Sequence, residues 1–197
     1  MISPTEYSRA GSGTETLADV LTRAPIPLTI GLKWAATVAG LLQDMHQRDC
    51  RHGKVTSANV VMRPDGPELV PPAQGFWREC SAERDVRGFG MMLYEVVTGK
   101  RAPEDPTEEL MPPPAARIEG LDGVRAAAVR LAVKCMGQLP ARPNMRQAAQ
   151  EIRLLCLHAR RMEAREGKAA AVPARAEAQP EKAEGERWMR VVREEVA

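Results

Sequence analysis

The chain has 197 residues, of which 44% are apolar, 27% charged and 4% aromatic, so it can bury one ordinary hydrophobic core. Ala, Leu, Val and Met supply most of the apolar content and aromatic residues are few, which favours helices over sheet and predicts a mainly α protein. A net charge of +2 with interspersed Arg and Glu argues against nucleic-acid binding, and no apolar run approaches the roughly 18 residues of a membrane span.

The first part of the chain contains two helix signals. Residues 1–14 are rich in Ser, Thr and Gly and are expected to form a flexible lead-in. Thr16 is a suitable N-cap for a short helix over residues 17–23, which two prolines then end. A longer helix is predicted over about 29–47, because apolar residues recur there at steps of three and four.

A polar loop and a small hairpin are expected next. The polar stretch before residue 60 leads into the apolar residues 60–62, which predict one strand. The sequence Arg-Pro-Asp-Gly at 63–66 is typical of a turn, and residues 68–70 predict a second strand that the following prolines end.

Three helices are predicted in the second half of the chain. Residues 85–99 are apolar nearly all round, which is typical of a helix that other helices cover on every side. Gly99 is expected to end this buried helix, and the proline-rich residues 102–114 are expected to form a loop. Further helices are predicted over about 121–136 and 144–162.

The composition changes after residue 162 to Ala, Glu, Arg and Lys with nearly balanced charge. Such a segment has too few apolar residues to form a core of its own. The sequence therefore predicts a flexible lead-in over 1–14, one domain over 15–162 and a charged, disordered tail over 163–197.

Residues 52–59 resemble the catalytic loop of a protein kinase. The pattern in that family is His-Arg-Asp, four variable residues and Asn, after which an apolar strand begins. Here His52, Lys54 and Asn59 stand at the positions of the histidine, the aspartate and the asparagine. The spacing matches, but a lysine occupies the position of the catalytic aspartate.

The order of the later segments extends the resemblance over about residues 15–157. Asp85 begins Asp-Val-Arg-Gly-Phe-Gly, which resembles the start of the buried helix in tyrosine-kinase-like kinases, and Arg142 lies in an Ala-Arg-Pro that resembles the segment before the last helix. The chain is thus similar to a protein kinase C-terminal lobe. This resemblance implies a C-lobe-like helical domain with a small β-hairpin, in which Asp85 accepts backbone N–H bonds from the loop.

The departures from the family imply a pseudokinase. An N-lobe with a glycine-rich phosphate loop and a strand lysine has no room in residues 1–14 and is expected to be missing. Where the metal-binding Asp-Phe-Gly is expected, the chain has Gly75, Phe76 and Trp77, or Ala73, Gln74 and Gly75 in another register. The metal carboxylate is absent in either register, so that metal triplet is degenerate. Ala-Pro-Glu is also absent, and its glutamate would normally pair with Arg142, which must find another partner or solvent.

The side chains at these positions favour structural roles over catalysis. Lys54 is cationic near pH 7 and cannot be the carboxylate that orients a hydroxyl nucleophile. Asn59 offers a neutral amide oxygen, a weak ligand for a hard cation, so we expect it to fix the loop. His52 is expected to pack near Asp85, and Arg142 to have a structural role. The sequence therefore predicts no catalytic residue, no metal and no cofactor.

The cysteines show no metal-binding spacing. Cys50, Cys80, Cys135 and Cys156 are far apart, without the paired spacing of zinc ligands. Reduced, buried thiols of a cytoplasmic protein are the preferred interpretation.

Three hypotheses for the function follow. The first is a catalytically inactive kinase-like module for protein interaction or scaffolding in signalling. Loss of the N-lobe would expose apolar surface near residues 15–21, which would bind a protein partner such as another kinase or a second copy. The alternative is a fragment or isoform of a longer serine/threonine or tyrosine kinase, in which a missing N-lobe supplies ATP binding. The third is an unrelated helical adaptor that shares the pattern by chance.

Overall fold

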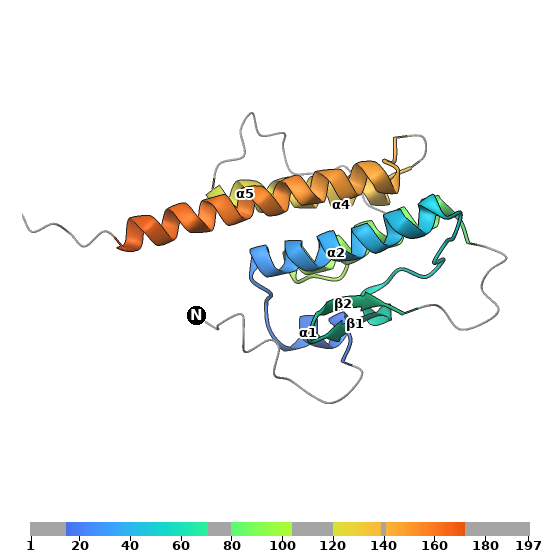
Figure 1. Cartoon of the computed structure of the whole chain (residues 1–197), viewed down its shortest axis with the longest axis horizontal. Coiled ribbons are helices and arrows are strands. Elements are labelled where there is room, and N and C mark those ends of the chain that lie inside the picture. The colour runs from blue at the N-terminus through green and yellow to red at the C-terminus, as the bar shows by residue number, and fades with distance from the viewer. Residues whose placement is uncertain (1–14, 71–79, 104–119, 139–140, 172–197) are drawn as a thin grey trace, which may run out of the picture. The chain divides into compact units, whose positions relative to one another are not determined.

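The computed structural model describes residues 15–70, 80–103, 120–138 and 141–171, with side chains as far as residue 165. These residues form α-helices and one small two-stranded antiparallel sheet, so the predicted mainly α class with a hairpin is confirmed (Figure 1). The chain divides into two compact units, Met1–Glu163 and Ala164–Ala197.

Helix α1 (Leu17–Arg23) begins at the predicted cap. The Thr16 hydroxyl accepts a hydrogen bond from the Asp19 N–H at 3.2 Å, and the Asp19 carboxylate accepts one from the Thr16 N–H at 2.9 Å. This reciprocal pair satisfies two N–H groups that the helix start would otherwise leave unpaired. Helix α2 (Leu28–Gln47) starts directly after Pro27 and buries one apolar face.

The hairpin follows a single turn of 3₁₀ helix. The elements are η1 (Ser57–Asn59), β1 (Val60–Arg63) and β2 (Gly66–Leu69). Arg63 pairs with Gly66, so the second strand starts directly after a two-residue turn rather than at the predicted residue 68. Among the described residues β2 pairs only with β1, so half of its backbone groups lie outside the ladder and Pro67 is tolerated there.

The segment before α1 lies beside β1. The Met62 N–H donates to the Glu15 carbonyl at 2.8 Å, and Thr16 forms an isolated bridge with Val61. The sequence did not predict this pairing, which ties the start of the described chain to the hairpin.

Helix α3 (Ala82–Thr98) is the buried helix that the sequence predicted over 85–99. It begins earlier than predicted, because Ser81 caps it by accepting a hydrogen bond from the Arg84 N–H at 3.2 Å. Asp85 therefore lies inside the first turn, where a carboxylate is favoured by the helix dipole. The helix ends at Gly99, whose φ of 67° is the left-handed conformation expected of a C-cap glycine.

Helix α3 packs extensively against α4 (Gly120–Met136) and also against α2. A Cβ added at Gly90 would lie 2.6 Å from the Cys135 Cβ and 2.7 Å from the Ala132 carbonyl oxygen of α4. One added at Gly31 of α2 would lie 2.6 Å from a methyl carbon of Val96. These two glycines therefore permit the close helix approaches that form the core around α3.

Helix α5 (Met145–Ala171) continues past the predicted end at residue 162. Its apolar face joins the same core as α3 and α4. The extension consists mainly of Ala, Glu, Arg and Lys, which are good helix formers, and this explains why the predicted tail begins as helix. The rest of the predicted tail, the lead-in and most of the proline-rich loop lie outside the described residues. None of the described helices combines the length and apolarity that a membrane crossing requires.

Candidate functional site

A buried carboxylate joins the end of α2, the 52–59 loop and the start of α3. Asp85 is fully buried, and its Oδ2 and Oδ1 accept hydrogen bonds from the N–H groups of His52 at 2.8 Å and Gly53 at 2.6 Å. The Oδ2 atom also lies 2.9 Å from His46 Nε2, which must donate because an ionised carboxylate only accepts. The expected backbone hydrogen bonds from the loop to Asp85 are therefore present, with His46 as an additional donor.

His52 has both ring nitrogens engaged. The side chain is buried, and its Nε2 lies 2.7 Å from the Val70 carbonyl oxygen, just after β2. Because a carbonyl only accepts, Nε2 carries the proton, while Nδ1 accepts from the Lys54 N–H at 3.3 Å. This arrangement links the loop to the hairpin, and the hydrogen bond from the His52 N–H places the residue next to Asp85, as expected.

Gly53 has a backbone conformation that a larger residue would not adopt easily. Its φ is 78°, and an added Cβ would overlap the Cys80 Sγ atom. The kinase pattern has arginine at this position. The loop therefore could not hold that arginine without moving.

Asn59 fixes the loop through its amide. Its Nδ2 donates to the Lys54 carbonyl at 2.8 Å, and its backbone carbonyl accepts from the Val70 N–H at 2.9 Å. Lys54 itself lies at an exposed position, at the place of the kinase aspartate. Within the described ranges, no group of three His, Cys, Asp or Glu side chains could hold a metal ion.

Arg142 bonds backbone carbonyls. Its guanidinium donates to the carbonyls of Gly137 at 2.9 Å, just after α4, and of Glu83 at 3.0 Å, in the first turn of α3. A cation at the C-terminal end of a helix also interacts favourably with the helix dipole. Arg142 thus links the end of α4 to the start of α3, an arrangement that the sequence left open.

Two further polar groups support the loop and were missed in the sequence. His46 lies in the last turn of α2, directly before the loop, a position that could have suggested contact with it. Ser57 donates to the Glu95 carboxylate at 2.8 Å, which ties η1 to α3. Gly75, Phe76 and Trp77, the predicted degenerate metal triplet, lie outside the described residues.

All four cysteines are free thiols. Cys135 and Cys156 are buried in the core, whereas Cys50 is exposed and Cys80 is half-buried. Burial raises the pKa of the Cys135 thiol to about 12, so this thiol stays protonated near neutral pH. The expectation of buried thiols therefore holds for the two helical cysteines and fails for Cys50, which follows the end of α2.

The Asp85 cluster makes stability depend on acid pH. Burial alone would raise the Asp85 pKa, but the hydrogen bonds from His46, His52 and Gly53 outweigh it and hold that pKa below the ordinary value of an aspartate. The ionised group therefore stabilises the fold above the unfolded-state pKa, and this contribution is lost as the pH falls through the lower folded-state pKa.

We expect the free energy of unfolding to fall as the pH is lowered from about 5 to about 2, and Asp85→Asn to fall less steeply over that range. Urea denaturation of both proteins at several pH values measures the difference. Asp19 and Glu83, whose pKa values are also lowered, remain in both proteins and serve as the internal control. If the free energy of unfolding of the two proteins fell in parallel with pH, Asp85 would not be the source of the acid dependence.

No protein-family model matches this sequence, and no curated protein is significantly similar to it. The resemblance to a kinase C-lobe therefore remains a prediction, and it rests only on the residues of this chain.

Proposed function

We propose that this chain is a catalytically inactive, protein kinase-like C-lobe that acts as a protein-interaction or scaffold module. The observation that carries the proposal is the loop from His52 to Asn59. Its polar groups bond the hairpin and Asp85, and Lys54 stands where a kinase needs its aspartate.

The chemistry of the loop supports inactivity. A protein kinase orients the substrate hydroxyl with a carboxylate and holds magnesium with a further carboxylate and an asparagine. Lys54 is cationic near pH 7, and the Asn59 amide already bridges the loop. A carboxylate restored at position 54 would not replace the further carboxylate that holds magnesium in a kinase, so a metal would still lack that ligand.

A longer kinase that carries an N-lobe upstream is the second candidate. This second candidate is favoured by the hydrogen bonds that hold the loop on Asp85, because an active catalytic lobe would also need a fixed loop. Lys54 would still argue against phosphoryl transfer in that longer protein.

The test is thermal unfolding of the full chain with ATP and either Mg²⁺ or Mn²⁺. We expect no shift in the melting temperature up to millimolar nucleotide, for both the parent chain and Lys54→Asp. A nucleotide present at 100 times its Kd would stabilise the fold by about 2.7 kcal/mol, which is easily detected. A saturable, metal-dependent shift in the parent chain would overturn the proposal.

A further inference from the structure

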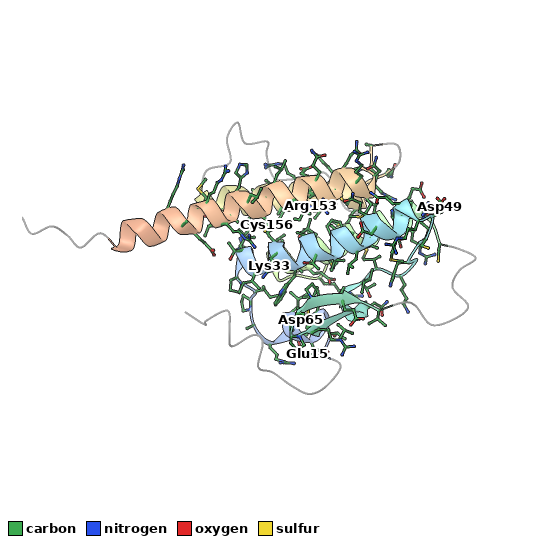
Figure 2. The ribbon with its side chains drawn as sticks, in the orientation of Figure 1. Glu15, Lys33, Asp49, Asp65, Arg153 and Cys156 are labelled. Atoms are coloured by element: carbon green, nitrogen blue, oxygen red, sulfur yellow. The ribbon has the colours of Figure 1, made fainter. Side chains whose placement is uncertain are left out.

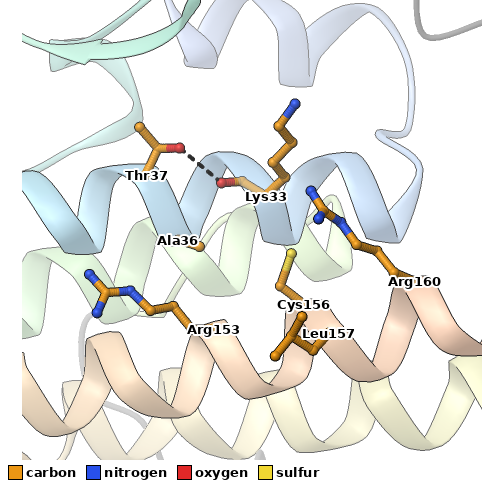
Figure 3. A pocket seen from close by; sticks show the side chains of 7 residues that line it. All are labelled: Lys33, Ala36, Thr37, Arg153, Cys156, Leu157 and Arg160. Carbon is orange, nitrogen blue, oxygen red and sulfur yellow. Dashed lines mark hydrogen bonds between the residues drawn. The ribbon is translucent and has the colours of Figure 1, made fainter.

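Helices α2 and α5 form a shallow groove of about 360 Å³ (Figure 3). Its lining residues are Lys33, Ala36, Thr37, Arg153, Cys156, Leu157 and Arg160. The Thr29 hydroxyl donates to the Glu163 carboxylate at 2.6 Å, and a Cβ added at Gly40 would lie 3.6 Å from a guanidinium nitrogen of Arg153. Residues 29–40 of α2 therefore run antiparallel to residues 163–153 of α5.

The groove is positively charged. Lys33 comes from α2 and Arg153 from α5 (Figure 2), and Arg160 lies two turns beyond Arg153 on α5 (Figure 3). Among the described residues that line it, none carries a carboxylate. The nearby Glu163 accepts a hydrogen bond from Thr29, beyond one end of the groove.

Apolar side chains lie between and beside these cations. Leu157 lines the groove and is 50% exposed, and Leu154, on the preceding turn of α5, is 53% exposed. Two leucines at this spacing on an otherwise polar helix face leave an apolar strip facing solvent. Ala36 and Cys156 provide a small apolar floor between the two helices.

We propose that this groove binds an acidic amphipathic helix of a protein partner. Leucine-like side chains of the partner would pack on Leu157 and Ala36, and its carboxylates would pair with Lys33, Arg153 and Arg160. A second copy is disfavoured because it would bring arginines of two α5 helices together, and nucleic acid is disfavoured by the exposed leucines. This inference deepens the proposed interaction role and rests on it, but it does not need the kinase resemblance.

The probe is a fluorescent peptide of about 18 residues with Leu at every third or fourth position and Glu at the flanking positions. Fluorescence anisotropy with the full chain is expected to show saturable binding that weakens as salt is added. The double variant Arg153→Glu/Arg160→Glu should weaken binding at least about tenfold, since two attractions become repulsions. Leu157→Ala should weaken binding and leave its salt dependence unchanged.

The matched control is Arg101→Glu/Arg146→Glu, which changes the net charge equally at two exposed positions outside the groove. It should change the peptide Kd less than about twofold. Equal weakening by the two double variants, or no saturable binding at about 1 mM peptide, would overturn the groove assignment. An oligonucleotide that binds with the same variant pattern would also overturn it. ATP-dependent stabilisation, by contrast, would overturn the proposed function without affecting peptide binding.

Discussion

Replacing Asp85 with alanine is expected to lower the free energy of unfolding by about 3–5 kcal/mol. The substitution leaves the N–H groups of His52 and Gly53 without an acceptor inside the protein, and it removes the partner of His46. Each buried donor left unpaired costs about 1–3 kcal/mol. Urea denaturation at pH 7 and 25 °C measures the loss.

Two variants make this result specific. Asp85→Asn keeps the shape and one acceptor oxygen, so its loss should be smaller than that of alanine. Asp44→Ala removes an exposed carboxylate from α2 and should stay within about 0.5 kcal/mol of the parent chain. A change below about 1 kcal/mol for Asp85→Ala would mean that the loop does not depend on this carboxylate.

Alanine substitutions at two helical glycines are expected to have opposite signs. Gly90→Ala should destabilise the fold by about 1–3 kcal/mol, because its Cβ would overlap Ala132 and Cys135 of α4. Gly40→Ala should stabilise it by about 0.4–1 kcal/mol, because only the flexible end of Arg153 lies nearby and alanine restricts the unfolded chain.

The same urea denaturation measures both glycine variants, and each is the control of the other since the chemical change is identical. If Gly90→Ala stabilised the fold as Gly40→Ala does, the close approach of α3 and α4 described above would be wrong.

Most features predicted correctly from the sequence depend on local chemistry, whereas the hydrogen bonds from the loop to Asp85 were implied by the family resemblance. Thr16 caps α1 through a residue three positions away, and Gly99 ends α3 because glycine adopts the left-handed conformation at no steric cost. The turn after β1 likewise needs only neighbouring residues. Such signals are contained in a few consecutive positions and can be recognised without the fold.

The features missed from the sequence depend on residues far apart in the chain. His46 reaches Asp85 across 39 positions, and Arg142 reaches the Glu83 carbonyl across 59. Neither contact changes the spacing of apolar residues along the chain, so hydrophobic periodicity cannot predict these contacts. The groove between α2 and α5 was missed for the same reason, since each helix alone shows only a mixture of cations and leucines.

For the loop from His52 to Asn59, the motif predicted which residues are important but not which contacts they make. The kinase-like spacing drew attention to His52 and Asn59, and Lys54 led to the prediction that this loop has no catalytic role. The structure adds the contacts of these residues, since the Asn59 amide donates to the Lys54 carbonyl and His52 Nε2 donates to the Val70 carbonyl.

Amide hydrogen exchange at His52 and Gly53 tests most directly whether Asp85 holds this loop as a structural element. If it does, both amides exchange only through global unfolding, with the same free energy that urea denaturation gives, and Asp85→Asn accelerates them. Exchange of both amides at the rate of an exposed loop in the parent chain would contradict the account.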